Sequence, residues 1–134
     1  MKIETSFFCD DVRQEFNGKF IFIGAYGGDI LLNTFPSNMT LYIVICARFA
    51  ATGAQDIEVE ARIKDRTLLK GKLNAHIAAL GFGYLPIPLP IVNILEPSDL
   101  IVRIKTPETK WREVGKIQLK LAIPAQQTPS ASVS

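Results

Sequence analysis

The stretch that decides the fold runs from Cys9 to Leu32, CDDVRQEFNGKFIFIGAYGGDILL. Its adjacent acids Asp10-Asp11 disfavour a sheet interior and predict a bend or bulge. Asn17-Gly18 predicts a two-residue hairpin turn, because both residues tolerate a positive φ. The segment 19–26, KFIFIGAY, is apolar at both alternating positions and predicts a central strand covered on both faces. Gly24 within it indicates a bulge or a close backbone approach.

The rest of the chain continues in short segments with strand periodicity. Segment 40–49 is apolar on both faces and predicts a second central strand. Segment 56–64 alternates strictly and predicts a strand with one face in water. Segment 66–80 carries leucines at helical spacing, and we expect a strand over 67–73 followed by a loop or one helical turn. Seven to nine strands between turn signals predict an all-β, two-layer antiparallel β-sandwich.

The segment 81–96, GFGYLPIPLPIVNILE, combines apolar residues with alternating prolines. Prolines cannot donate to a strand ladder, so the segment predicts an edge strand or an extended connection. Two interpretations of its apolar side chains stay open: they close the core, or they form a contact surface for a partner. The residues concerned are Tyr84, Ile87, Leu89 and Ile91.

Length and composition limit the classes of protein to consider. The 134 residues predict a single domain over 1–124, followed by a disordered, uncharged tail over 125–134. The net charge is +2 with bases scattered among acids, which argues against a nucleic-acid partner. No apolar run reaches the roughly 20 residues of a membrane span, and no secretory signal is expected. Cys9 and Cys46 are expected to be buried free thiols in the cytoplasm.

Charged residues near the hairpin are the candidate site residues. Asp11, Arg13 and Glu15 fall on one face of an extended strand, where they form either a recognition patch or a solvated ion-pair ladder. Asp10, Asp11 and Asp29 could supply oxygen ligands to calcium, although turn-capping is the alternative.

Other residue types offer less chemistry. The sequence contains no G-x-G-x-x-G motif and only one histidine, which supplies neither a metal set nor a catalytic triad. Trp111 is expected in the core, with a binding platform as the alternative. We therefore expect no catalytic residue, cofactor or resident metal.

The block from Phe8 to Ile30, followed by Phe35-Pro36, resembles a family of small uncharacterised bacterial and phage proteins. The shared pattern is C-D-D-x-R-x-E, then G-K, then I-G-x-Y-G-x-D-I. The resemblance covers Phe8 to Pro36; it implies a bacterial or phage setting and assigns no catalytic residue. The strand rhythm is also similar to immunoglobulin-like and C2-like sandwiches, which mostly bind rather than catalyse.

These patterns lead to one functional hypothesis and one alternative. The first is a non-enzymatic cytoplasmic β-sandwich that contacts another protein, such as a phage or bacterial accessory protein that interferes with a host system. The alternative is a small-molecule or calcium-binding sandwich that uses the region of Asp10, Asp11 and Asp29. A homo-oligomer stays open in either case.

Overall fold

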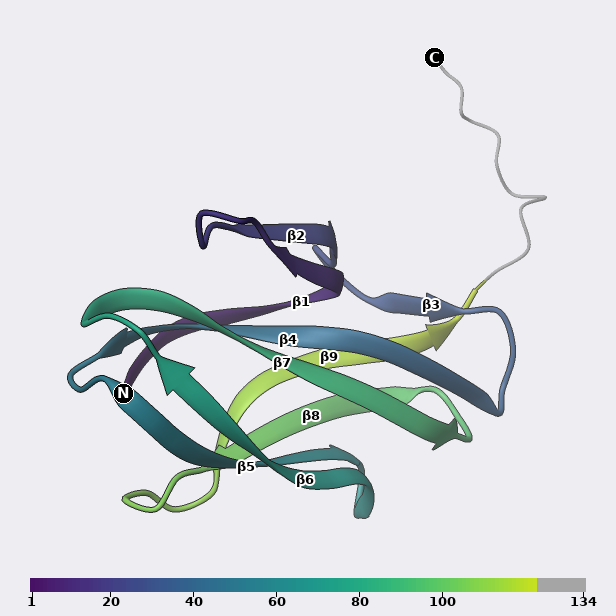
Figure 1. Cartoon of the computed structure of the whole chain (residues 1–134). Helices are drawn as coiled ribbons and strands as arrows, with labels where there is room; N and C mark the ends of the chain where they lie inside the picture. The colour runs from purple at the N-terminus through teal and green to yellow at the C-terminus, as the bar shows by residue number, and fades with distance from the viewer. Residues whose placement is uncertain (123–134) are drawn as a thin grey trace.

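The computed structural model describes residues 1–122, so the predicted tail at 125–134 lies outside the described residues. The described part is an all-β sandwich of two sheets without a helix (Figure 1). Its nine strands are β1 (Lys2–Gln14), β2 (Phe20–Ala25), β3 (Ile30–Leu32), β4 (Ser37–Phe49), β5 (Gly53–Ile63), β6 (Arg66–Ile77), β7 (Gly81–Ile94), β8 (Ser98–Lys105) and β9 (Arg112–Leu121). One sheet has the order β2-β1-β4-β7, and the other has the order β3-β9-β8-β5-β6. Neighbouring strands are antiparallel, except that β3 and β9 are parallel.

The core fills the space between the inner faces of the two sheets. β4 lies between β1 and β7 and is buried on both faces, which confirms the central strand predicted at 40–49. The alternation predicted for segment 56–64 also holds on its inner face. Its buried side chains are those of Ile57, Val59, Ala61 and Ile63.

β7 is the terminal strand of the four-stranded sheet, which confirms the edge strand predicted from the prolines. Its pairing with β4 extends from Phe49 opposite Gly81 to Ser37 opposite Ile94, with one register shift between Met39 and Ser37. Pro86, Pro88 and Pro90 are two residues apart, so their nitrogens point to the same side of the strand. The missing N–H groups therefore fall on the free edge, where no ladder is interrupted.

β6 is one continuous strand, and the prediction of a loop or helical turn after residue 73 is wrong. Leu69, Leu73 and Ile77 are four residues apart, a spacing that also lies on one face of a strand. All three pack in or against the core. Pairing with β5 along the whole strand decides the conformation here, which local propensity could not reveal.

β1 changes partners at Cys9, beside the acid pair that predicts a bend. Residues up to Cys9 pair with β4, and those from Cys9 to Gln14 pair with β2. Figure 1 shows the strand turning back at this point, so that the β1–β2 hairpin lies above the four-stranded sheet. Among the strands of residues 1–122, β2 pairs with β1 alone and is the terminal strand of its sheet. The prediction of a central strand at 19–26 is therefore wrong.

The hairpin turn contains three residues, Phe16, Asn17 and Gly18, instead of the two predicted. The Glu15 N–H donates to the Lys19 carbonyl (2.6 Å), and the Gly18 N–H donates to the Glu15 carbonyl (2.9 Å). Gly18 has the predicted positive φ, 88°. A tight turn followed by a left-handed glycine is a common three-residue hairpin loop. The additional residue places Phe16 within the turn itself.

Candidate interaction surface on the β1–β2 hairpin

The bend in β1 is stabilised by contacts between Asp10 and two residues at the end of β2. Gly24 has a φ of 68°, and a side chain there would collide with the Asp10 carboxylate. The glycine is therefore required by the backbone and by a close approach, as predicted. The Tyr26 hydroxyl donates to the Asp10 carboxylate, and the Tyr26 N–H donates to the Phe8 carbonyl (2.8 Å). These contacts fix the hairpin relative to the sandwich.

The surroundings of the bend disfavour ionisation of its phenol and thiol. Burial, with the hydrogen bond and negative charge of Asp10, raises the pKa of Tyr26 to about 12. Burial and then the Asp10 charge raise the pKa of Cys9. Burial and then the Glu4 charge raise the pKa of Cys46. Both cysteines are buried and unpaired, as expected, and a thiol with a raised pKa is a poor nucleophile.

An aromatic cluster joins the hairpin to the outer face of the four-stranded sheet. The ring of Phe22 in β2 contacts Phe7 of β1 and Tyr84 of β7 edge-to-face, each with 5.0 Å between ring centroids. Phe20 lies 6.0 Å from Tyr84, and Phe82 lies 5.3 Å from Tyr84. Such edge-to-face pairs are favourable beyond the area they bury. We call these five rings, Phe7, Phe20, Phe22, Phe82 and Tyr84, the aromatic cluster.

The aromatic cluster covers a second, smaller apolar layer outside the main core. Val44 and Cys46 of β4 face away from the inner side of the sheet, yet they are only 0% and 5% exposed. Val44 lies opposite Phe7 in the β1–β4 register, and Cys46 lies opposite Tyr84 in the β4–β7 register. The rings therefore bury the outer face of β4. The hairpin is held against the sheet by side-chain packing as well as by the strand pairing of β1.

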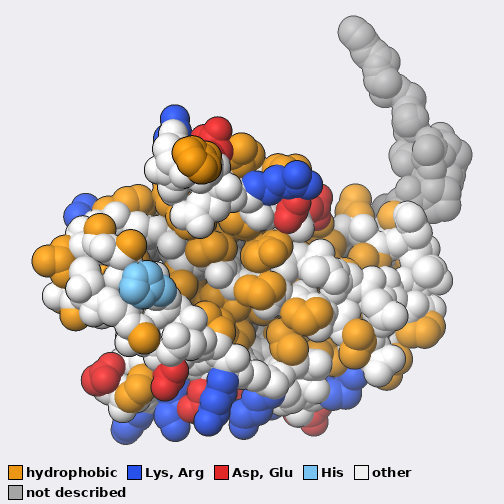
Figure 2. All heavy atoms as spheres, in the orientation of Figure 1, with side chains coloured by type: hydrophobic (Ala, Val, Ile, Leu, Met, Phe, Trp, Pro, Cys, Tyr) orange, Lys and Arg blue, Asp and Glu red, His pale blue; other side chains and the backbone are white. Residues whose placement is uncertain are grey.

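The part of the hairpin that faces away from the sheet is apolar and exposed. Phe16 in the turn is fully exposed, and Ile21 and Ile23 of β2 are 44% and 42% exposed. Figure 2 shows hydrophobic and charged side chains next to each other on this projecting element. The sequence contains a signal for Phe16, because an aromatic residue directly before the turn residues Asn17-Gly18 is expected at the tip of a hairpin, away from the core.

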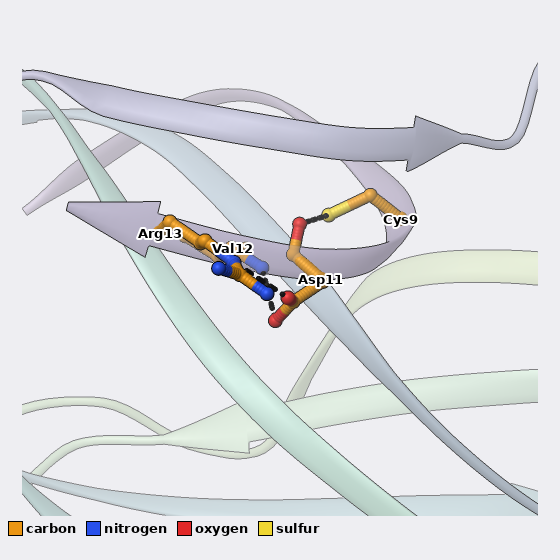
Figure 3. Close-up of polar contacts among 4 residues, drawn as sticks. All are labelled: Cys9, Asp11, Val12 and Arg13. Carbon is orange, nitrogen blue, oxygen red and sulfur yellow. Dashed lines mark hydrogen bonds and ion pairs between the residues drawn. The ribbon is translucent and has the colours of Figure 1, made fainter. Parts of the chain in front are cut away.

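The predicted ladder of Asp11, Arg13 and Glu15 is only partly present. The Arg13 Nε atom lies 3.2 Å from the Asp11 Oδ2 atom, and the Val12 N–H donates to the same carboxylate (2.9 Å). Figure 3 shows these contacts on β1 where the strand bends, with the Cys9 thiol donating to the Asp11 carbonyl (3.5 Å). Glu15 lies beyond the end of β1, directly before the three-residue turn, and its backbone N–H and carbonyl both form hydrogen bonds that close the hairpin.

Of the four residues predicted as a contact surface on β7, three lie in the core and one is exposed. Ile87, Leu89 and Ile91 are 1%, 0% and 1% exposed and lie in the core. The core interpretation holds for these three, because a side chain inside the sandwich cannot contact a partner. Tyr84 is 40% exposed and belongs to the aromatic cluster, so it stays a candidate.

The acids considered for calcium have separate partners. Asp10 accepts from Tyr26, Asp11 pairs with Arg13, and Asp29 pairs with Lys120, with 2.7 Å between Oδ2 and Nζ. Within residues 1–122, no three side chains of His, Cys, Asp or Glu are grouped so that they could hold a metal ion. The geometry therefore does not favour a calcium site at this end of the hairpin.

Trp111 is not a core residue, contrary to the expectation. Its ring lies 5.7 Å from the Lys70 ammonium and 5.5 Å from the Arg103 guanidinium, on the outer side of the five-stranded sheet. Glu60 belongs to the face of segment 56–64 that was predicted to lie in water, but it is buried there, with 3.2 Å between its Oε1 atom and the Arg103 Nη1 atom. Cations prefer the face of an indole ring, and this attraction competes with burial of the ring in the core.

Comparison of the chain with protein-family models and with curated proteins finds no match. None of the described residues forms a helix that is long and apolar enough to span a membrane.

Proposed function

We propose that this protein is a non-enzymatic β-sandwich that binds another protein through its β1–β2 hairpin. The observation that carries the proposal is the fully exposed Phe16 in the turn of a hairpin that is itself held rigidly by the aromatic cluster. An aromatic side chain on a pre-organised element loses little conformational entropy when it binds. Aromatic residues in desolvated pockets also contribute much of the energy of protein interfaces.

The chemistry around Phe16 suggests what the partner offers. Ile21 and Ile23 extend the apolar surface along β2, and the Asp11–Arg13 ion pair lies on the neighbouring strand. A partner that fits has an apolar pocket for the phenyl ring and a rim with both charges. Such a surface, with apolar centre and polar rim, is the common anatomy of protein interfaces. We place the interaction in the bacterial cytoplasm, where buried free thiols persist.

The test is a capture experiment with matched serine variants. The immobilised wild-type chain, Phe16→Ser and Leu95→Ser are incubated with bacterial lysate, and bound proteins are quantified by mass spectrometry. Leu95 is an exposed apolar residue in the β7–β8 connection and serves as the control. The proposal predicts a protein retained by the wild-type chain and by Leu95→Ser. Loss of a hot-spot contact of about 2 kcal/mol lowers its capture by Phe16→Ser about 30-fold.

A second measurement completes the test with the captured protein in purified form. Its dissociation constant is compared for the three chains by calorimetry, and the mass of each free chain is measured by light scattering. Equal affinity for wild type and Phe16→Ser contradicts the proposal. Self-association that disappears in Phe16→Ser identifies a second copy of the chain as the partner instead.

A further inference from the structure

The two sheets end in four terminal strands, β2, β7, β3 and β6, and three of these carry features that hinder the addition of another strand. β7 has its prolines on the free edge, where they leave no N–H to donate. β6 carries Lys70 and Lys72, and β3 is only three residues long. Prolines, lysines and short length are common means by which edge strands avoid further pairing.

β2 has none of these features. Its six residues, FIFIGA, contain no charge and no proline, and among the strands of residues 1–122 it pairs with β1 alone. Ile21 and Ile23 are exposed on one face of β2, and Gly24 and Ala25 are exposed at its end. Figures 1 and 2 show that the β1–β2 hairpin projects above the sandwich. β2 is therefore the terminal strand that is open to pairing.

The hydrogen bonds of the hairpin determine which backbone groups of β2 face its free edge. The Glu15 N–H donates to the Lys19 carbonyl (2.6 Å), so these two residues form a hydrogen-bonded pair. Hydrogen-bonded and non-hydrogen-bonded pairs alternate along an antiparallel ladder, and the β1–β2 register is continuous from Phe20 to Phe22. The N–H and carbonyl groups of Ile21 therefore face β1. Those of Phe20 and Phe22 face the free edge.

We propose that β2 pairs with β2 of a second copy of this chain, antiparallel, with Phe20 of each copy opposite Phe22 of the other. In this register the outward-facing residues of both strands meet, and each such pair can exchange both of its N–H···O=C bonds. The two-fold axis then passes between the two Ile21 residues. A register centred on Phe22 would require Gly24 in the ladder, and its φ of 68° departs from strand geometry.

The chemistry of β2 fits a second copy of itself. Residues directly opposite in a ladder point to the same face, so aromatic rings meet aromatic rings and Ile21 meets Ile21. No charge is brought against a like charge, because β2 has none. The contact uses each free β2 edge once, and the other terminal strands hinder further addition, so the assembly closes as a dimer. Phe16 lies in the turn, outside this ladder, so the dimer does not depend on the proposed protein contact.

Sedimentation of the whole purified chain is the first test. Between chain concentrations of about 1 and 100 µM, we expect a reversible change from one copy to two. A chain that stays monomeric over this range overturns the inference, and so do assemblies of more than two copies. In a monomer, protection of the Phe20 and Phe22 amides from hydrogen exchange would instead identify another segment of the same chain on this edge.

A disulfide between two copies tests the register. The two Ile21 residues form a non-hydrogen-bonded pair with Cα atoms about 4.5 Å apart, a distance that a disulfide can span. Ile21→Cys should therefore give a disulfide-linked dimer under mild oxidation.

Ile23→Cys is the matched control for the disulfide. Ile21 and Ile23 are 44% and 42% exposed, but the two Ile23 residues would lie roughly 14 Å apart along the paired strands. The wild-type chain is the blank, because Cys9 and Cys46 are buried. Equal crosslinking of Ile21→Cys and Ile23→Cys contradicts the pairing.

A charge at the same position tests the contact without crosslinking. Ile21→Lys places two ammonium groups opposite each other and is expected to weaken dimerisation at least about tenfold. Ile21→Thr keeps a β-branched, uncharged residue and should weaken it by less than about threefold. Phe16→Ser should dimerise like the wild type, which separates this contact from the one proposed for the turn. Unchanged dimerisation of Ile21→Lys, shown to be folded by circular dichroism, contradicts the inference.

Discussion

Replacing Phe22 by alanine tests whether packing holds the hairpin against the sheet. Phe22 contacts Phe7 and Tyr84, each at 5.0 Å between centroids. Each pair contributes about 0.5–1.5 kcal/mol beyond the buried area, and a fully buried Phe→Ala costs about 3–5 kcal/mol. Phe22 is only partly buried, so we expect a loss of about 2 kcal/mol, near the middle of these limits.

Two assays measure this loss. For a domain of this size each kcal/mol lowers the melting temperature by about 3–4 °C, so Phe22→Ala is expected to melt about 7 °C lower. The second assay follows labelling of Cys46 by a thiol reagent. Cys46 lies under the aromatic cluster, opposite Tyr84. Undocking of the hairpin should expose it, and labelling should become faster below the melting transition.

Phe16→Ala is the matched control, because it removes the same side chain from the same hairpin. Phe16 is fully exposed, and its removal should change neither the melting temperature nor the labelling of Cys46. If Phe22→Ala has the same melting temperature as Phe16→Ala, and Cys46 is labelled at the same rate in both variants, the aromatic cluster does not hold the hairpin against the sheet. In that case the β1–β2 hairpin is not a pre-organised element.

Three further results are expected. Gly24→Ala should lower the free energy of unfolding by about 2–3 kcal/mol in urea denaturation, because Gly24 has a positive φ and a Cβ atom there would collide with Asp10. The control Gly28→Ala should lower it by under about 1 kcal/mol. Ile87→Asp should unfold the chain, since it buries an unpaired charge at a position 1% exposed; a folded monomer by circular dichroism and gel filtration refutes this. The raised pKa of Tyr26 favours the neutral phenol in the folded state, so its contribution is complete below pH 10 and is lost as pH rises towards about 12. The stability difference between wild type and Tyr26→Phe should therefore shrink over that range, and a constant difference contradicts the assignment.

Much of the fold could be predicted because several signals are local. The alternation of apolar residues determines which face of β5 is buried, independent of the neighbouring strands. Prolines exclude β7 from a sheet interior because they lack a backbone N–H donor. Gly18 likewise reports its own backbone conformation. These signals do not depend on which strands become neighbours.

The errors concern contacts that only the assembled sheets create. The apolar residues on both faces of segment 19–26 predicted a central strand. After the bend at Cys9 one face packs on the outside of the sheet and the other stays exposed. The four-residue spacing in β6 fits a helix and a strand equally, and pairing with β5 decides between them. Glu60 is buried beside Arg103 from the next strand, a neighbour that no local pattern specifies.

The residues now proposed for contact lie on the hairpin that the sequence also singled out, but most of them are other residues. The acids and Arg13 attracted attention as charged groups, whereas the exposed surface also contains Phe16, Ile21 and Ile23. Their exposure depends on the position of β2 at an edge, which the sequence did not reveal. The position of these apolar residues in the fold, and not their residue type, therefore makes them a surface instead of a part of the core.

The most direct test of the proposed protein contact through the hairpin is photo-crosslinking from the turn itself. The photoreactive residue p-benzoylphenylalanine is introduced at Phe16 in one chain and at Leu95 in another, and both are irradiated in bacterial cells. A discrete crosslinked product from position 16 and none from position 95 is the predicted result. Irradiation that yields no product from position 16, or the same products from both positions, contradicts the account.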